Sequence, residues 1–367
     1  YMGMCAHGYY CAMSSNRPLG RMLVSKAGNK TVDVDISKVS LGSFYTTKSG
    51  WLTPEVRTFL EKALEHSGGN LLDPFAGDGH LINAVQEDLI LGQKIAKANG
   101  FDIQGTTWPI NDSLIAIPNP KRAVILTNPP YLANHSAKRK GVSSLVSKYF
   151  EQSTYKNLYM IALENALACA DYVVAIIPET FLLSSFPKDR LELAVVIQDS
   201  LFGDTDAPAL VACFTKTNCA DARIFTGTQP IGNLKQILAL RESTAPKQKI
   251  VFNDPSGRIG LRAVDGSDGK SPIAFVAAKD FSYPSESVAV SSRLMTYLDV
   301  PEISDDEIGL AIAKANAALR KIRKDSGDLV LAPFKGNDRS GRRRRRLDYA
   351  LARRILNEAV ASLKRAK

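Results

Sequence analysis

The sequence predicts an α/β fold with a mostly parallel sheet, followed by a smaller C-terminal α+β domain. Across residues 41–215, short apolar runs typical of buried strands alternate with stretches of helical periodicity, which is the pattern of βαβ units. Beyond Asn218 the pattern changes to short segments separated by turn sequences such as Asp254-Pro255-Ser256-Gly257, and two helical stretches follow. These two patterns favour two domains in this chain of 367 residues.

The domain boundary is expected between 215 and 225, so that residues 41–217 form the first domain and 218–367 the second. Residues 1–40 are expected to form an N-terminal extension. Its first dozen residues have neither the basic start nor the continuous apolar centre of a signal peptide. They are interpreted either as an addition to the natural chain or as an alternative start upstream of Met13.

Local signals predict the individual elements. Thr53-Pro54-Glu55 begins a helix with a capping hydroxyl, an early proline and an acidic first turn, and Gly68-Gly69 ends it. Strands are expected at Asn70–Asp73, Phe101–Ile103, Ala123–Leu126, Tyr172–Ile177 and Leu210–Phe214. Further helices are expected from near His80, in a Lys-rich stretch that ends at Asn99-Gly100, at Leu158–Ala170, and at about 305–324 and 347–364.

The composition excludes several classes of protein. Apolar residues make up 45% and charged residues 23% of the chain, which is ordinary for a folded domain. No stretch of about 20 residues is apolar enough to predict a transmembrane helix. The five cysteines form no Cys-x-x-Cys pair and there are four histidines, so neither a disulfide framework nor a metal site is expected. This cysteine usage favours a reducing cytoplasm.

The positive charge is concentrated near the C-terminus. Residues 335–367 hold twelve Lys or Arg and three acids, so they carry +9 of the formal net charge of +10. Five consecutive arginines, Arg342 to Arg346, stand in this segment, and the acids nearby are too few to neutralise them. A concentrated basic segment predicts a polyanionic partner. Lys138-Arg139-Lys140 is a second short basic run, for which a solvated turn and a phosphate contact are equally good interpretations.

One short motif indicates a reaction. Asn128-Pro129-Pro130-Tyr131 follows directly on an expected buried strand, and the two prolines end the strand because they donate no backbone hydrogen bond. Open α/β sheets bind ligands at this edge. The Asn128 side chain and the Pro129 carbonyl can accept hydrogen bonds from an amino group, while Tyr131 offers an aromatic face.

Three acidic positions accompany this motif. Asp73 to Gly79, with the sequence Asp-Pro-Phe-Ala-Gly-Asp-Gly, joins a strand to a helix, and its glycines allow the backbone to approach a ligand closely. Asp102 lies at the end of the next expected strand, where a carboxylate suits the two hydroxyls of a ribose. Asp112 begins the following segment, where a carboxylate could accept from an adenine amino group.

Together these motifs resemble the S-adenosylmethionine-dependent N6-adenine DNA methyltransferases of the gamma arrangement, in which the cofactor motifs precede Asn-Pro-Pro-Tyr and a target-recognition domain follows. The resemblance covers about residues 41–215 and implies a Rossmann-like methyltransferase sheet. Gly42 to Thr47 is similar to the N-terminal cofactor motif Phe-Tyr-Thr-Pro, with Thr47 in place of the proline. Phe202 is the best match for the aromatic residue that stacks on the target base in this family.

The resemblance implies a set of site residues. The expected cofactor-binding residues are Phe44, Tyr45, Thr46, Asp73, Phe75, Ala76, Gly77, Gly79, Asp102, Ile103, Asp112, Ser113 and Asn128. The expected catalytic residues are Asn128, Pro129, Pro130 and Tyr131, and Tyr131 and Phe202 are expected to stack on the target base. The expected DNA-backbone contacts are Lys138, Arg139, Lys140, Arg342, Arg343, Arg344, Arg345 and Arg346.

The implied function is methyl transfer from S-adenosylmethionine to N6 of a flipped-out adenine in double-stranded DNA, as the modification enzyme of a restriction–modification system. A cognate restriction endonuclease is expected to be a separate chain, and the protein to be a monomer in the bacterial cytoplasm. Three alternatives stay open: a methyltransferase acting on RNA, one acting on protein glutamine, and a non-catalytic DNA-binding protein on the same scaffold. The N-terminal cofactor motif, the separate second domain and the arginine run favour DNA over the first two, and the intact Asn128 and Asp73 argue against the third.

Overall fold

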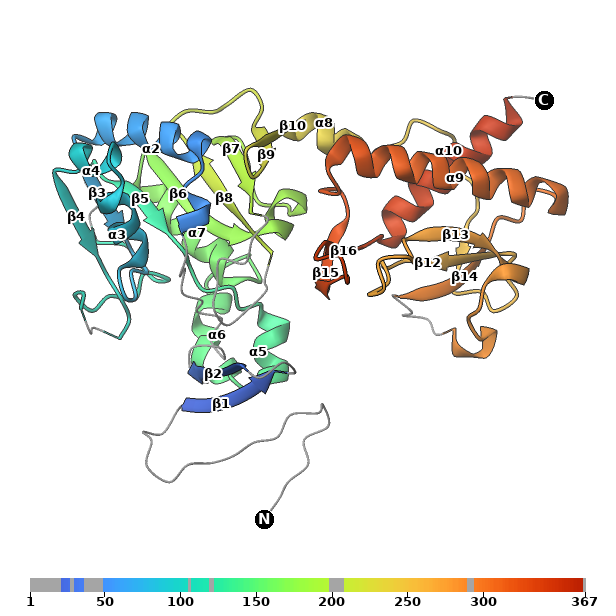
Figure 1. Cartoon of the computed structure of the whole chain (residues 1–367), viewed down its shortest axis with the longest axis horizontal. Coiled ribbons are helices and arrows are strands. Elements are labelled where there is room, and N and C mark those ends of the chain that lie inside the picture. Colours follow the sequence, from blue (N-terminus) through green and yellow to red (C-terminus); the bar gives the residue numbers. More distant parts are fainter. Residues whose placement is uncertain are drawn as a thin grey trace, which may run out of the picture. The chain divides into compact units, whose positions relative to one another are not determined.

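A computed structural model (Figure 1) describes residues 21–26, 30–35, 49–104, 107–118, 122–197, 208–288 and 294–365. The chain folds into two compact units. The first lies within Tyr1–Pro178, Phe186–Ala220 and Phe225–Thr228, and the second within Glu179–Ser185, Asp221–Ile224 and Gln229–Lys367. No helix in the described ranges combines the length and the apolar character that crossing a membrane requires.

The first unit is built on a large, mostly parallel sheet. Its strands are β3 (Asn70–Asp73), β4 (Lys97–Gly100), β5 (Val124–Thr127), β6 (Tyr172–Pro178), β7 (Leu191–Val196), β8 (Ala209–Phe214) and β9 (Arg223–Thr226), and the edge strand β10 (Gln229–Asn233) begins the last segment of the second unit. The strand order is β10-β9-β7-β8-β6-β5-β3-β4. Strands β4, β3, β5 and β6 pair in parallel, and β8 lies antiparallel between β6 and β7. The mixed α/β fold with a mostly parallel sheet is therefore confirmed.

The topology places a crevice at one edge of this sheet. Both β4 and β5 pair with β3, so the chain moves outward on one side of β3 and then returns to its other side. In open α/β sheets, ligands bind outside the carboxyl ends of the strands at such a switch point. Asp73 is the last residue of β3, and Asn128 follows directly after β5. The two candidate residues therefore lie at the same switch point.

Helices cover both faces of the sheet. The elements of the first unit are η1 (Ser49–Trp51), α2 (Pro54–Ser67), α3 (His80–Glu87), α4 (Leu91–Lys94), α5 (Asn134–Lys140), α6 (Ser143–Glu151) and α7 (Leu158–Cys169), together with a separate antiparallel pair, β1 (Arg21–Lys26) and β2 (Lys30–Asp35). Helix α2 begins as expected, because the Thr53 side chain accepts a hydrogen bond from the Val56 N–H, and Gly68 ends it at φ +67°. The buried core under α2 and α3 includes Leu71 of β3 and Leu126 of β5.

Two expectations for the first unit differ from the structure. The strand expected at Phe101–Ile103 is β4, which ends at Gly100, and the expected Lys-rich helix ends at Lys94. The backbone N–H groups of Ala96 and Lys97 donate to the Gly69 carbonyl, so this stretch pairs with β3 instead of continuing the helix. The sequence does not predict strand β7. Leu191–Val196 is a short apolar run, and such a run fits a buried helix as well as a strand.

The second unit combines a small sheet with two long helices. Its antiparallel sheet has the order β11 (Val251–Phe252), β14 (Met295–Asp299), β12 (Ile259–Arg262) and β13 (Ala274–Ala277). The other elements are η2 (Glu179–Leu183), α8 (Leu234–Ala239), η3 (Ala278–Asp280), η4 (Ser285–Ser287), α9 (Asp305–Ser326), the hairpin of β15 (Ala332–Asn337) and β16 (Arg343–Arg346), and α10 (Tyr349–Lys364). Helix α9 packs on α10 and on β13 (Figure 1). Both expected helices of this part of the chain are confirmed.

Candidate active site

A pocket of about 370 Å³ opens at the switch point of the first unit, a volume within the range of small-molecule sites. It is lined by Asp73, Phe75, Ala76, Gly77, His80, Leu81, Asp102, Ile103, Gln104, Asn111, Asp112, Ser113, Leu114, Asn128, Pro130, Leu145, Val146, Lys148, Tyr149 and Leu158. Asp73 ends β3, and the other residues follow β3, β4 or β5 or belong to α3, α6 and α7.

The pocket brings together most of the described residues that the sequence suggests. They are Asp73, Phe75, Ala76, Gly77, Asp102, Ile103, Asp112, Ser113, Asn128 and Pro130. Gly79, Pro129 and Tyr131 are described but do not line it. The expected cofactor residues Phe44, Tyr45 and Thr46 and the expected stacking residue Phe202 lie outside the described residues.

The backbone beside the pocket requires glycine at two positions. Gly79 precedes α3 with φ +80°, and a Cβ there would lie 3.2 Å from the Trp108 ring. At Gly100, the last residue of β4, a Cβ would lie 2.6 Å from the Cβ of Ala76 and 2.7 Å from Trp108. A side chain at Gly100 would therefore push the turn of residues 73–79 away from β4. The glycines allow the turn to lie directly against the neighbouring strand.

Asp73 is a buried acidic residue whose pKa is raised by its surroundings. It is 2% exposed, and its Oδ1 accepts a hydrogen bond of 3.0 Å from the Phe75 N–H. Burial raises the pKa of Asp73 to about 7, against the opposing effect of hydrogen bonds from Phe75 and Thr127. A cationic group in the pocket would favour the ionised form. Asp73 is therefore suited to binding an ammonium group.

The raised pKa of Asp73 predicts a specific pH dependence of stability. Because the folded-state pKa of Asp73 is about 7 and its ordinary value is 3.8, the native protein holds a proton between these pH values that the unfolded chain has lost. The contribution of Asp73 to the free energy of unfolding should fall as pH rises from about 4 to 7, by roughly 4 kcal/mol at most. Asp73→Asn should remove this loss and be the more stable protein at pH 8. Urea unfolding of both proteins at pH 5 and pH 8 measures this difference. If the free energy of unfolding changes by the same amount between the two pH values in the wild type and in Asp73→Asn, the burial argument is contradicted.

Asp102 is oriented by the backbone. Its Oδ2 accepts from the Gly77 N–H at 3.1 Å, and its Oδ1 accepts from the Gln104 N–H at 2.8 Å. Each oxygen retains further acceptor capacity, because a carboxylate oxygen has two lone pairs. The side chain therefore lines the pocket in a fixed orientation and can receive two hydroxyl donors.

Asp112 carries a buried acceptor that is not used. Its Oδ2 accepts from Lys148 Nζ at 3.0 Å and from the Tyr149 hydroxyl at 2.8 Å. Its Oδ1 is buried, and no donor in the described part of the chain bonds to it. A buried acceptor without a donor is costly. Because Asp112 lines the pocket, this oxygen indicates a ligand that donates a hydrogen bond.

The residues after β5 are held tightly. Pro129 is buried and Asn128 is half-buried, and Asn128 lines the pocket. The Tyr131 hydroxyl donates to the Ile176 carbonyl at 2.9 Å, and the ring meets Tyr159 edge-on at a centroid distance of 6.3 Å. Burial raises the pKa of Tyr131 well above its usual value, so the phenol stays protonated. The Tyr131 ring is thus fixed at its hydroxyl end by the sheet.

Sequence reasoning missed the contribution of α6. Leu145, Val146, Lys148 and Tyr149 line the pocket, but no motif marks this helix. Its apolar stripe is the only signal in the sequence, and that stripe predicts packing without indicating a ligand. His80 and Gln104 are two further pocket residues that the sequence does not single out. Among the described residues, no group of three or more His, Cys, Asp or Glu side chains is arranged to hold a metal ion.

The two basic runs lie in different units. Lys138, Arg139 and Lys140 are exposed in the last turn of α5. Arg343 to Arg346 form β16, which pairs with β15 and whose side chains therefore alternate between two faces.

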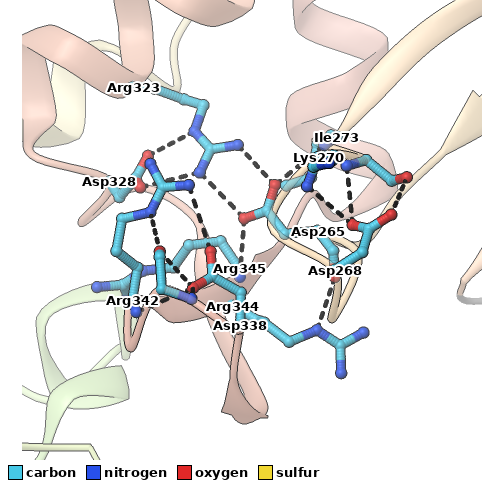
Figure 2. Close-up of polar contacts among 12 residues, drawn as sticks. Asp265, Asp268, Lys270, Ile273, Arg323, Asp328, Asp338, Arg342, Arg344 and Arg345 are labelled. Carbon is cyan, nitrogen blue, oxygen red and sulfur yellow. Dashed lines mark hydrogen bonds and ion pairs between the residues drawn. The ribbon is translucent and has the colours of Figure 1, made fainter.

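Carboxylate and backbone carbonyl oxygens of aspartates outside the arginine run accept hydrogen bonds from several of its members (Figure 2). Arg344 Nε donates to the Asp265 carbonyl at 2.7 Å, and its guanidinium lies 5.0 Å from the centre of the Phe334 ring. The Asp265 carboxylate accepts from the Arg345 N–H at 3.1 Å and from Arg323 at 2.8 Å. Burial alone would raise the pKa of Asp265, but the hydrogen bonds from Arg323 and from backbone N–H groups lower it below its usual value.

The expectation that all five arginines face phosphates is wrong for Arg345. Its guanidinium forms an ion pair with Glu179 of η2, and the two side chains are 9% and 5% exposed. Glu179 lies 166 positions from Arg345 in the sequence, so the acids near the arginine run do not reveal this partner. Arg342 is the opposite case, because its side chain is 73% exposed and its pair with Asp338 spans 3.3 Å.

This difference predicts how a single arginine substitution would affect the DNA binding that the sequence leads us to expect. Arg342→Ala should weaken binding to matched and mismatched duplexes alike, because phosphate contacts carry no sequence information. The slope of log K against log salt should become flatter by about 0.9. Fluorescence anisotropy at several salt concentrations measures the slope. An unchanged slope would show that Arg342 is only a solvated side chain.

No protein-family model matches the sequence, and no curated protein matches it. Solved structures resemble the chain weakly. The methyltransferase subunit of a type I restriction-modification system from Streptococcus thermophilus is 16% identical, with a TM-score of 0.33 over 53% of this chain and 52% of that one. The type IIL restriction-modification enzyme MmeI, solved in complex with DNA, is 12% identical, with a TM-score of 0.35 over 63% and 46%. The type IIG restriction endonuclease BpuSI is 14% identical, with a TM-score of 0.36 over 55% and 29%. The chain thus spans about half or less of the length of these structures.

Proposed function

We propose that this protein transfers a methyl group from S-adenosylmethionine to the exocyclic N6 of adenine in DNA. The observation that carries the proposal is the convergence of Asp73, Asp102, Asp112 and Asn128 on one pocket at the switch point of the sheet. These four side chains come from four separate stretches of sequence, and each offers a polar group that suits one part of the cofactor or substrate.

The acceptors around the pocket suit a nucleoside that carries an amino acid group. Asp102 is oriented to accept from two ribose hydroxyls, and Oδ1 of Asp112 needs a donor such as an adenine amino group. Asp73, with its pKa raised by burial to about 7, becomes fully ionised beside an ammonium group. The bound cofactor would supply an electrophilic methyl group on its sulfonium.

The residues after β5 suit the second substrate. The Asn128 side chain and the Pro129 carbonyl would accept hydrogen bonds from the two N–H groups of an amino group, which directs the nitrogen lone pair toward the methyl group. The amino nitrogen would form its bond to the methyl group as the bond from sulfur to that methyl group breaks, S-adenosylhomocysteine would leave, and the nitrogen would release one hydrogen as a proton to water. This function therefore needs orientation more than a general base. A base inside a duplex is out of reach, so the adenine must flip out of the helix. Tyr131 and Phe202 are proposed to stack on its two faces, and Tyr131 is supported in this by the bond that fixes its hydroxyl to Ile176.

Double-stranded DNA is the proposed substrate because of the basic residues. Residues 218–367 would form the target-recognition domain, with the exposed and half-buried arginines of 342–346, except Arg345, on phosphates. Lys138 to Lys140 are proposed as a second backbone contact. The protein would act as a monomeric modification enzyme in a bacterial cytoplasm, paired with a restriction endonuclease on a separate chain.

A transfer assay with methyl-labelled S-adenosylmethionine tests the proposed substrate. Purified protein is incubated in parallel with mixed-sequence duplex DNA, with RNA, and with a glutamine-containing protein lysate. Label in DNA alone is expected. Label in RNA or in protein would select the corresponding alternative methyltransferase. DNA binding without cofactor cross-linking or transfer would indicate a non-catalytic DNA-binding protein.

A further inference from the structure

We propose that Lys148 and Tyr149 of α6 are positioning residues, which set the Asp112 carboxylate so that the pocket accepts a 6-amino purine and rejects a 6-oxo purine. The inference rests on the proposed function, because it takes the purine of the cofactor as the ligand of this part of the pocket. It adds specificity-determining residues from a helix that no sequence motif marks.

The geometry of the Asp112 carboxylate supports this role. Oδ2 receives two donors, Lys148 Nζ at 3.0 Å and the Tyr149 hydroxyl at 2.8 Å. With one oxygen bound from two directions, the carboxylate cannot rotate without breaking both bonds. Oδ1 is therefore held in one place, buried and without a donor in the described ranges of the chain. All three residues line the same pocket.

The loop that carries Asp112 is fixed from a second helix. The Asn165 side chain on α7 donates to the carbonyls of Ser113 at 3.2 Å and Leu114 at 2.9 Å. The Asp112 carbonyl accepts from the Ile115 N–H at 2.9 Å. Because α7 holds the backbone and α6 holds the side chain, the position of Oδ1 is determined before any ligand binds.

The charge states make the site selective. Burial raises the pKa of Tyr149, and the adjoining Asp112 raises it further, so the phenol remains a donor at neutral pH. The hydrogen bond from Lys148 to Asp112 raises the pKa of the lysine, which therefore stays cationic. An ionised carboxylate only accepts hydrogen bonds. A 6-amino group can donate to Oδ1, whereas a 6-oxo group would place a second acceptor against it.

The arrangement has little value as a stabilising contact alone. Lys148 is 53% exposed, and exposed ion pairs add little to stability. Leu145 and Val146 of the same helix also line the pocket, so α6 supplies one apolar wall together with the two donors. Its larger effect is therefore on the orientation of Asp112.

Calorimetry with two nucleosides tests the inference on the full chain. S-adenosylhomocysteine carries the 6-amino group, and S-inosylhomocysteine carries a 6-oxo group in its place. The wild-type protein should bind the first about 100-fold more tightly than the second, because sites built around a hydrogen bond reject analogues that lack it. Tyr149→Phe should reduce this ratio by about ten-fold, since it removes a donor to a charged group.

Two further variants make the test independent of folding defects. Lys148→Met should also lower the ratio, and its partly exposed side chain is removed with little effect on packing. Tyr155→Phe is the matched control, because Tyr155 packs on Phe186 and does not line the pocket. Its ratio should equal that of the wild type. A wild-type ratio that persists in both Tyr149→Phe and Lys148→Met overturns the inference but leaves the proposed function standing. Wild-type protein that binds neither nucleoside overturns both.

Discussion

The rate of methyl transfer should be about 100- to 1,000-fold lower in Asn128→Ala than in the wild type, while the affinity for the cofactor is retained. The side chain lines the pocket directly after β5, where it is proposed to accept a hydrogen bond from the target amino group. Its loss removes an interaction that orients the nitrogen lone pair during transfer. The contacts of Asp102 with Gly77 and Gln104 are untouched, so the ribose site should remain intact.

Single-turnover transfer and calorimetry together check this result. The cofactor Kd should change by no more than about two-fold, since the proposed nucleoside contacts are those of Asp102 and Asp112, which the substitution leaves in place. Asn83→Ala is a suitable control, because Asn83 is an exposed residue of α3 and does not line the pocket. Full activity in Asn128→Ala would refute the proposed mechanism. An equal loss of cofactor affinity and transfer would instead assign Asn128 to the cofactor.

Arg345→Ala should destabilise the second unit by about 3–5 kcal/mol. Removal of the guanidinium leaves the Glu179 carboxylate buried at 5% exposure without its cation. The loss of one partner of a buried ion pair is far more costly than the replacement of both. Glu179→Leu combined with Arg345→Met should therefore recover most of the lost stability.

Urea unfolding distinguishes Arg345 from its neighbours in β16. Arg342→Ala is the matched control, because the 73%-exposed Arg342 contacts Asp338 and Ser340 at the end of the hairpin, and its removal should change stability by less than about 1 kcal/mol. If Arg345→Ala and Arg342→Ala lower the free energy of unfolding by the same amount, the buried ion pair does not hold β16 in place. If the double substitution is no better than Arg345→Ala, lost packing rather than an unpaired charge explains the effect.

The sequence predicts those parts of the fold and site that depend on local signals. The helix beginning at Pro54 follows from the Thr53 cap, and Gly68 ends it. The buried strand β5 is recognisable by its branched apolar residues and by the prolines behind it. Asp73 and Asp102 can be placed in advance because Asp73 ends one strand and Asp102 closely follows the next, and the carboxyl ends of parallel strands share one edge of the sheet.

Contacts between distant parts of the chain could not be predicted in this way. Lys148 and Tyr149 reach Asp112 across 36 and 37 positions, and their helix shows only an ordinary apolar stripe. The pairing of Arg345 with Glu179 depends on the placement of η2 beside β16, which no local pattern encodes. The sequence therefore presents all five arginines as equally able to contact phosphates. In the structure they differ, because β-strand alternation places their side chains on two faces and Arg345 is paired with the buried Glu179.

The identity of the methylated nucleoside tests the central proposal most directly. Duplex DNA free of methylated adenine is incubated with the protein and S-adenosylmethionine, digested to nucleosides and separated by mass-detected chromatography. We expect N6-methyl-2′-deoxyadenosine with the wild-type protein and little or none with Asn128→Ala. A methylated cytosine would contradict the adenine assignment, and the same amount of N6-methyladenine from both proteins would contradict the role of Asn128. Unmodified DNA from wild-type protein that binds S-adenosylhomocysteine would contradict DNA as the substrate.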